Sequence, residues 1–132
     1  MKKTILGTAC VLGMLAVVFG AFGAHGLKKL VDENAIGTFE TGVRYQMYHA
    51  FFLFVLALLP DTLVRTKTLI YSCIVTGVVL FSFSIYLLAL NGLVGFDSSV
   101  LGMVTPIGGV FLIAGWVLLG YKIVRANGSK LE

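Results

Sequence analysis

Ionisable and aromatic side chains gather within residues 39–59 of this sequence. Glu40 and Arg44 are four residues apart, the spacing at which a carboxylate and a guanidinium meet on one face of a helix. At about 100° per residue, this helix has a polar half and an apolar half. The polar half holds Glu40, Thr41, Arg44, Tyr45, Tyr48 and His49, and the opposite side holds Phe39, Val43, Met47, Ala50 and Phe54.

Two hypotheses explain this polar half. In the first, Asp32 to Arg44 is an amphipathic segment at the outer membrane interface, where its charges stay hydrated. In the second, Glu40, Arg44, Tyr45 and His49 form a polar patch inside a helical bundle that binds a headgroup, an ion or a partner subunit. Ionisable residues at membrane depth usually face protein or a water-filled cavity, which is the basis of the second hypothesis.

The two histidines, His25 and His49, raise the question of a shared metal or a bis-histidine haem. Two ligands do not complete a zinc site, and no cysteine or acidic residue lies at ligand spacing. Cys10 and Cys73 are isolated within apolar runs, as is typical of small buried side chains. We therefore expect no metal and no cofactor.

Sequence patterns of known catalytic sites are absent. The chain has no G-x-S-x-G motif, no glycine-rich phosphate loop with a lysine and no H-E-x-x-H motif. Its net charge is +4, but no run of Lys and Arg reaches five residues and no basic segment alternates with aromatic residues. We expect a protein that is neither an enzyme nor a nucleic-acid-binding protein.

The elements that must position these residues follow from composition. Apolar residues make up 58% of the 132 residues and charged residues 12%, against about 45–50% and about 25% in soluble domains. The mean hydropathy is +0.99. These values predict an all-α integral membrane protein, because spanning segments must satisfy their backbone polar groups internally. We expect one domain, residues 1–132, forming a four-helix bundle with spans near 5–24, 39–59, 69–90 and 101–121.

The first span has features of a signal peptide, since Lys2 and Lys3 precede an apolar run that ends in small residues at 21–24. The run is long for a signal peptide, and we expect it to stay as a membrane helix. An even number of spans places both termini on one side of the membrane. That side would carry Lys2, Lys3, Arg65, Lys67, Lys122, Arg125 and Lys130, against Lys28, Lys29 and Arg44 opposite. The positive-inside rule then predicts cytoplasmic termini in the bacterial inner membrane.

Small residues recur at helical spacing and predict where helices pack closely. The first span has such a stripe, which includes Gly13, Gly20 and Gly23. Gly77 lies on a second stripe, with Cys73, Ser84 and Asn91, and Gly109 on a third, with Gly102 and Trp116. These stripes mark either the bundle interior or the contact face of an oligomer. Pro106 either begins the regular part of the fourth helix or kinks it.

Four blocks of this chain resemble the small bacterial membrane proteins grouped as domain of unknown function 423. They are GAFGAHGL at 20–27, TGVRYQMYHA at 41–50, FSFSIYLLAL at 81–90, and TPIGG at 105–109 with Gly115 and Trp116. Phe83 stands where the family typically has glycine. The resemblance implies a four-helix protein of the bacterial cytoplasmic membrane and no particular activity. It also implies that His25, Glu40, Arg44, Tyr45, His49, Ser84, Tyr86 and Thr105 occupy motif positions.

Size decides between the remaining functions, since four short helices enclose little volume for transport. We expect an accessory or interaction subunit of a membrane complex, or a homo-oligomer, in contact with membrane lipids. The alternative is a small transporter or channel whose path follows the polar arc of the second helix. A haem-binding or lipid-headgroup-binding protein is the third possibility.

Overall fold

Every regular element in the described part of the chain is helical, which confirms the all-α prediction. A computed structural model describes residues 1–61, 63–95 and 97–126, and it has no strand in these ranges. The elements are α1 (Lys2–His25), the 3-10 turn η1 (Leu27–Lys29), α2 (Glu33–Leu58), α3 (Lys67–Val78), the π-helix η2 (Val79–Phe83), α4 (Ser84–Ala89), α5 (Asn91–Val94) and α6 (Ser98–Arg125).

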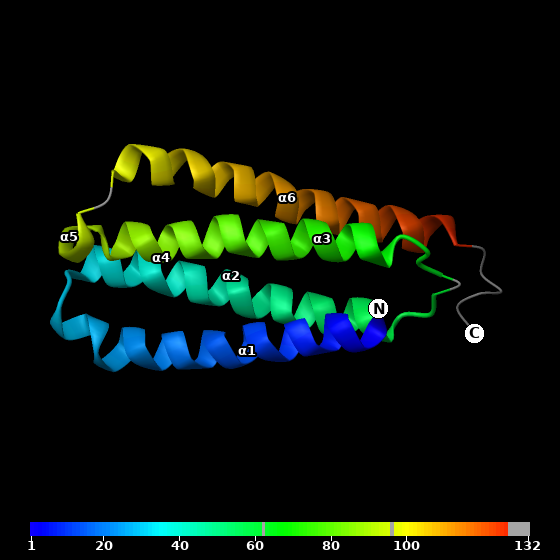
Figure 1. The fold of residues 1–132 in the computed structure, drawn as a ribbon, viewed down its shortest axis with the longest axis horizontal. Coiled ribbons are helices and arrows are strands. Elements are labelled where there is room, and N and C mark those ends of the chain that lie inside the picture. Colours follow the sequence, from blue (N-terminus) through cyan, green and yellow to red (C-terminus); the bar gives the residue numbers. More distant parts are fainter. Residues whose placement is uncertain (62, 96, 127–132) are drawn as a thin grey trace.

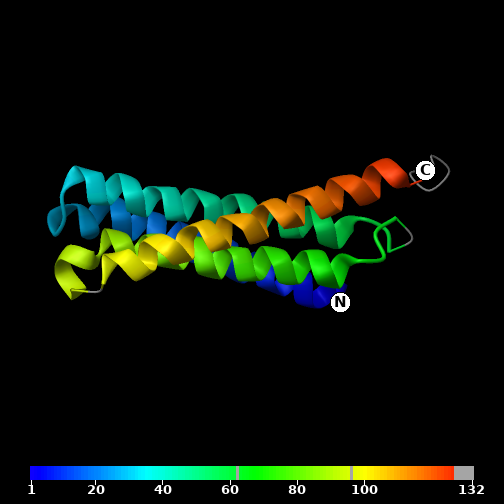
Figure 2. The ribbon, with the colours of Figure 1, turned by 90° about the horizontal axis from the view of Figure 1, so that it is seen from above.

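The long segments run side by side (Figure 1). α1 packs along α2, and the continuous segment α3–η2–α4 packs between α2 and α6. The N-terminus, the α2–α3 connection and the end of α6 lie at one end of the molecule, while η1 and α5 lie at the other (Figures 1 and 2). α6 runs obliquely across its neighbours (Figure 2).

Three helical stretches are long and apolar enough to cross a membrane: Lys2–Lys29, Lys67–Ala89 and Ser98–Arg125. α2 is similar in length, with 26 residues. Its residues 33–49 include Glu33, Glu40, Arg44, Gln46 and His49, which lower its hydropathy. α2 is therefore the element whose surface differs most from that of a simple membrane span.

Two helices begin earlier than predicted because aspartates cap them. Asp32 accepts a hydrogen bond from the backbone nitrogen of Ala35 at 2.8 Å, so α2 begins at Glu33 and not near residue 39. Asp97 accepts one from the backbone nitrogen of Ser99 at 2.9 Å, so α6 begins at Ser98 and not at 101. Such N-caps satisfy backbone donors that a helix start leaves free.

Pro106 lies inside α6, which begins at Ser98. Of the two predicted roles of Pro106, the one in which it begins the regular part of the helix is therefore wrong. The π-helix η2 was not predicted at all. A π-helix inserts one extra residue into a helix and shifts the faces on either side of it. Here it lies where α6 crosses, and Gly108 of α6 faces the backbone of Leu80 and Phe81.

Apolar side chains fill the centre of the bundle. Ile5, Leu53, Leu56, Ile70 and Ile74 have no exposed surface and pack in one cluster toward the end that holds the N-terminus. A smaller cluster of Leu27, Phe39, Tyr86 and Ala89 lies at the opposite end. The helices are held together by the van der Waals contacts of these closely packed apolar side chains.

Glycines allow the closest helix contacts. A Cβ atom added at Gly13, Gly20 or Gly23 would meet Ala50, Val43 or Phe39 of α2 at 3.9, 3.6 and 3.1 Å. One added at Gly77 would lie 2.5 Å from Leu112 of α6, and one at Gly109 would lie 3.8 Å from Phe81.

The third predicted stripe lies beside the packing face of α6 and not on it. Gly102 has no neighbour within 4 Å and Trp116 is exposed. The buried residues of α6 are Gly108, Leu112, Gly115 and Leu119.

The α2–α3 connection is fastened by the side chain of Lys67. Its Nζ donates to the backbone oxygen of Leu59 and lies 2.7 Å from Oδ1 of Asp61. The Lys67 side chain is 6% exposed and that of Asp61 is 88% exposed. A buried ammonium is costly unless it is paired, and these two oxygens supply the pairing.

Candidate functional site

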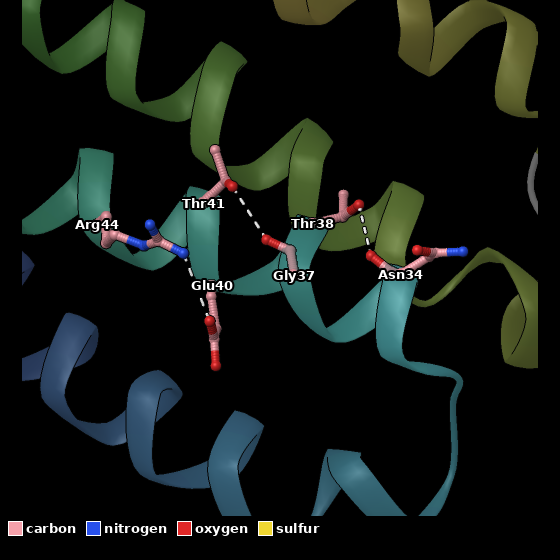
Figure 3. A network of polar contacts seen from close by, with 6 residues as sticks. All are labelled: Asn34, Gly37, Thr38, Glu40, Thr41 and Arg44. Atoms are coloured by element: carbon pink, nitrogen blue, oxygen red, sulfur yellow. Dashed lines mark hydrogen bonds and ion pairs between the residues drawn. The ribbon is translucent and has the colours of Figure 1, made fainter.

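The polar side chains of α2 point in different directions around the helix. Glu40 points toward α1, whereas Thr38 and Thr41 lie on the other side of the helix (Figure 3). Both threonine hydroxyls donate to carbonyls of their own helix, those of Asn34 and Gly37, at 3.0 Å (Figure 3). These threonines are thus satisfied within α2. Its charged residues are Glu33, in the first turn, and Glu40 and Arg44 further along the helix.

Glu40 and Arg44 form an ion pair on the surface. Nη2 of Arg44 lies 3.4 Å from Oε2 of Glu40, and their side chains are 52% and 58% exposed for Glu40 and Arg44 respectively. The pair borders a groove of about 350 Å³ between α1 and α2, whose other lining residues are Gly20, Gly23, Phe39 and Val43. We call this surface the Glu40–Arg44 groove.

The level of this groove follows from its contacts with α1. Gly20 lies opposite Val43 and Gly23 opposite Phe39, so the ion pair is near the end of the apolar run of α1. The same exposed side of α2 continues toward the termini as Phe51, Val55 and Leu58, which are lipid-compatible residues. The Glu40–Arg44 groove therefore lies where this exposed apolar strip ends, on the side toward Glu33 at the start of α2.

His49 does not join the ion pair, so the structure does not assemble the predicted patch of Glu40, Arg44, Tyr45 and His49. His49 is 4% exposed and faces α6. Its Nδ1 is 2.7 Å from the backbone oxygen of Tyr45, and Trp116 Nε1 donates to its Nε2 at 3.2 Å. An indole N–H is only a donor, so Nε2 is an acceptor and the proton lies on Nδ1.

His49 lines a second groove, between α2, η2 and α6. Its volume is about 310 Å³ and its lining is mainly aromatic and aliphatic: Tyr45, His49, Phe81, Gly109, Leu112, Ile113 and Trp116. Tyr45 is 4.8 Å from Phe81 between ring centroids, and Trp116 is 54% exposed. We call this the aromatic groove.

A buried glutamine, which the sequence analysis did not single out, links three helices. Gln46 has no exposed surface; its Nε2 donates to the Leu12 carbonyl of α1 at 2.8 Å, and its Oε1 accepts from the Tyr86 hydroxyl of α4 at 2.7 Å. Ser82 of η2 similarly donates to the Gly42 carbonyl at 2.9 Å. A signal for Gln46 was present, because it lies within about 20° of Phe39 on the apolar side of the helical wheel.

The remaining predicted residues occupy other places. Ser84 and Thr105 share a hydrogen bond of 2.7 Å that ties α4 to α6. Tyr48 is 54% exposed beside Tyr45. Neither contact reaches Glu40 or Arg44, so these residues belong to different surfaces.

His25 is exposed at the end of α1, and its Nδ1 lies 3.1 Å from the Ala21 carbonyl. Gly13 packs at the level of Ala50, so His25 is about 18 Å along α1 from the level of His49. One iron or zinc ion cannot bind both. In the described ranges no group of three or more His, Cys, Asp or Glu side chains is placed to hold a metal.

Comparison with known proteins gives one family. The model of the family described as "Protein of unknown function (DUF423)" matches residues 19–109. The chain is 39% identical to the UPF0382 membrane protein YwdK of Bacillus subtilis over 125 residues, which are 93% of this chain and 98% of YwdK.

Two further relatives are similar over most of their length. The identity is 35% with a UPF0382 membrane protein of Haemophilus influenzae, over 96% of this chain and 98% of that one. It is 37% with the UPF0382 inner membrane protein YgdD of Escherichia coli, over 94% and 92%. No solved structure matches the chain.

Proposed function

This chain belongs to the DUF423 family of small bacterial membrane proteins of unknown function, and we propose that it is an accessory subunit that binds a membrane partner through the Glu40–Arg44 groove. The matched residues, 19–109, include every residue that lines this groove. The partner that fits is a second membrane protein whose helix carries polar side chains at the same level. A second copy of this chain is the competing partner.

The exposed ion pair is the observation that carries this proposal. Surfaces that face lipid are apolar, whereas Glu40 and Arg44 are more than half exposed beside two glycines of α1. Glycines let a partner helix approach closely, and polar side chains then hydrogen-bond across the contact. A polar helix would thus cover both the charges and the shallow surface left by Gly20 and Gly23.

The proposal includes four crossings, with α2 as the fourth spanning helix beside the three apolar stretches. The partner covers the part of α2 that is too polar for lipid. In this arrangement both termini are cytoplasmic. The start of α1, the α2–α3 connection and the end of α6 lie at one end of the molecule (Figure 1), and these segments carry Lys2, Lys3, Arg65, Lys67, Lys122 and Arg125. Lys130, which also counted toward the prediction, lies outside the described residues.

A channel through one chain is less well supported. A polar path along α2 would have to pass Gln46 and then Leu53 and Leu56, which are fully buried. Both ends of the Gln46 amide are already hydrogen-bonded within the protein. The exposed pair therefore favours binding at the surface over conduction through the centre.

Exchanging the charges of Glu40 and Arg44 distinguishes two roles of this ion pair, contact with a partner and stabilisation of α2 alone. The double variant Glu40→Arg/Arg44→Glu keeps an ion pair at the same spacing but reverses the charges that a partner would meet. We expect the wild-type protein, gently solubilised from bacterial membranes, to give a stoichiometric complex with a second membrane protein in native mass spectrometry. The exchanged variant should be monomeric.

The variant Tyr121→Phe provides a control, because Tyr121 is exposed on α6, far along the chain from the groove. Its complex should equal that of the wild type. A complex unchanged by the exchange, or a wild-type protein that is monomeric, would refute the proposal. A symmetric oligomer lost on exchange would replace the foreign partner with a second copy.

A further inference from the structure

We propose that the aromatic groove binds the head group of an isoprenoid quinol. This inference goes beyond the partner-binding proposal, because the aromatic groove involves η2 and α6 and excludes Glu40 and Arg44. Its polar side chains are Tyr45, His49 and Trp116, and the Nε1 of Trp116 donates to the Nε2 of His49 at 3.2 Å.

The depth of the groove selects a neutral ligand. His49 precedes Ala50, which packs against Gly13 near the centre of the apolar run of α1. Phospholipid head groups are charged or zwitterionic and stay near the membrane surface, whereas quinols carry an uncharged head group that enters the hydrocarbon. The lining residues of the groove carry no formal charge when His49 is neutral, so the site offers no partner for an ionic head group.

The position of Trp116 is also informative. Tryptophan in membrane proteins is enriched at the membrane–water interface. Trp116 lies instead at the level of His49 and is half exposed. Its indole N–H donates to His49 Nε2. Polar side chains at this depth usually have a functional role.

The hydrogen-bonding groups match a hydroxyl. His49 Nε2 is an acceptor and Trp116 Nε1 is a donor, and they are only 3.2 Å apart, so a ligand hydroxyl has to replace their bond. When the half-exposed Trp116 side chain turns away to admit it, the hydroxyl donates to His49 Nε2 and accepts from Trp116 Nε1. A quinone carbonyl accepts from Trp116 but leaves His49 Nε2 without a donor. The groove is therefore complementary to the reduced form, and the proposal includes no redox step.

The shape fits a flat ring with a tail. Tyr45, Phe81 and Trp116 provide aromatic surfaces, and aromatic rings favour offset or edge contacts with one another. Gly109 leaves room at the edge of the groove, because a Cβ added there would still be 3.8 Å from Phe81. Ile113 and Trp116 at the groove are exposed apolar residues of a helix long and apolar enough to span the membrane, so an isoprenoid tail leaving the groove would run along this apolar surface. A volume of about 310 Å³ accommodates a substituted six-membered ring.

Calorimetric titration of the purified protein in detergent with decylubiquinol tests the proposal. We expect one saturable site, and weaker binding of the oxidised decylubiquinone by about three- to tenfold, the effect of one lost hydrogen bond. Decanol, which has a chain and a hydroxyl but no ring, should not displace the quinol. Because Trp116 is the single tryptophan of the chain, its fluorescence should be quenched saturably by decylubiquinone.

Two variants separate binding from folding. His49→Leu should weaken quinol binding and abolish the preference for the reduced form, whereas His25→Leu, at the exposed histidine, should change neither. Gly109→Leu fills the groove while it leaves His49 and Trp116 in place, and should abolish saturable quenching. Equal binding by the Gly109→Leu variant, displacement by decanol, or quenching that stays linear with concentration would overturn the proposal.

Discussion

At the residue scale, Gln46 is the polar side chain most deeply built into the bundle. It bonds to a carbonyl of α1 and to the Tyr86 hydroxyl of α4, so it fixes α2 against both neighbours. Leaving one of these groups unpaired in a dry interior is costly, whereas removing both partners together is less so. The Gln46–Tyr86 contact should therefore show energetic coupling.

A double-mutant cycle measures this coupling. Gln46→Leu leaves the Tyr86 hydroxyl without its partner, and Tyr86→Phe leaves Gln46 Oε1 without a donor. We expect each variant to be destabilised and the double variant to lose less than the sum, with a coupling of about 0.6–1.7 kcal/mol, as for hydrogen bonds between membrane helices. Unfolding in mixed micelles measures the four free energies. Additive losses would show that the bond contributes no coupling energy.

Asp61 and Lys67 predict a dependence of stability on pH. The hydrogen bond from Lys67 and its positive charge hold the pKa of the Asp61 carboxyl below its ordinary value of 3.8. A carboxyl with a lowered pKa in the folded state stabilises it above pH 3.8, and this contribution is lost as the pH falls through the lower folded-state pKa. The effect is small because Asp61 is exposed to solvent.

The measurement compares thermal unfolding of the wild type and Asp61→Asn between pH 6 and pH 2.5. The wild type should have the higher midpoint at pH 6, and the difference should disappear at the acidic end. Asp97, whose pKa is lowered by hydrogen bonds from the Ser99 side chain and backbone, is unchanged in both proteins. A difference that persists at pH 2.5 would contradict the role of the Asp61 charge.

What could be predicted at this scale depended on local spacing. The Glu40–Arg44 pair forms at the i, i+4 spacing from which its contact was expected. The partner of His49 could not be predicted, because Trp116 lies 67 residues away and reaches His49 only through the crossing of α6 over α2. Contacts between distant residues depend on helix rotations that one sequence leaves undetermined.

At the element scale, η2 and α6 determine how closely the layers approach. A Cβ atom added at Gly108 would lie 2.8 Å from the backbone carbon of Leu80. Backbone atoms cannot move aside as the end of a side chain can, so η2 and α6 would have to separate. The spacing of small residues predicted close packing for α6 along Gly102, Gly109 and Trp116, but Gly108 and Gly115 make its closest contacts.

This contact predicts opposite effects for two glycines of α6. Gly108→Ala should destabilise the protein by about 1–3 kcal/mol, because it overpacks a backbone contact. Gly102→Ala has no neighbour to displace and should be neutral or slightly stabilising, since alanine favours helix more than glycine does. Thermal midpoints in the same detergent provide the comparison. Equal midpoints for the two variants would show that α6 does not approach η2 as closely as described.

At the scale of the whole molecule, charge distinguishes its two ends. The start of α1, the α2–α3 connection and the end of α6 lie at one end (Figure 1) and carry Lys2, Lys3, Arg65, Lys67, Lys122 and Arg125, with Asp61 as an acidic residue. The segments next to η1 and α5 lie at the other end and carry Lys28, Lys29, Asp32 and Asp97. Composition and long apolar runs were sufficient to predict a helical membrane protein, because hydrocarbon restricts the available structures. They were insufficient to establish α2 as a span, since its charges are half exposed.

The orientation of the protein in the membrane depends both on the charge difference between its ends and on whether α2 crosses. If α2 crosses and the positive-inside rule holds, a reporter fused to the C-terminus is cytoplasmic, and a reporter fused after Gly92 in α5 is on the outer side. We expect green fluorescent protein to be fluorescent only at the C-terminus and alkaline phosphatase to be active only after Gly92. Both reporters on one side would mean that the chain between them does not cross. Reversed activities would mean either that α2 does not cross, because the other three spans alone leave Gly92 inside and the C-terminus outside, or that the cluster of basic residues faces outward. Fusions after Lys29 and after Arg65, which flank α2, separate these two cases, because they lie on opposite sides of the membrane only if α2 crosses.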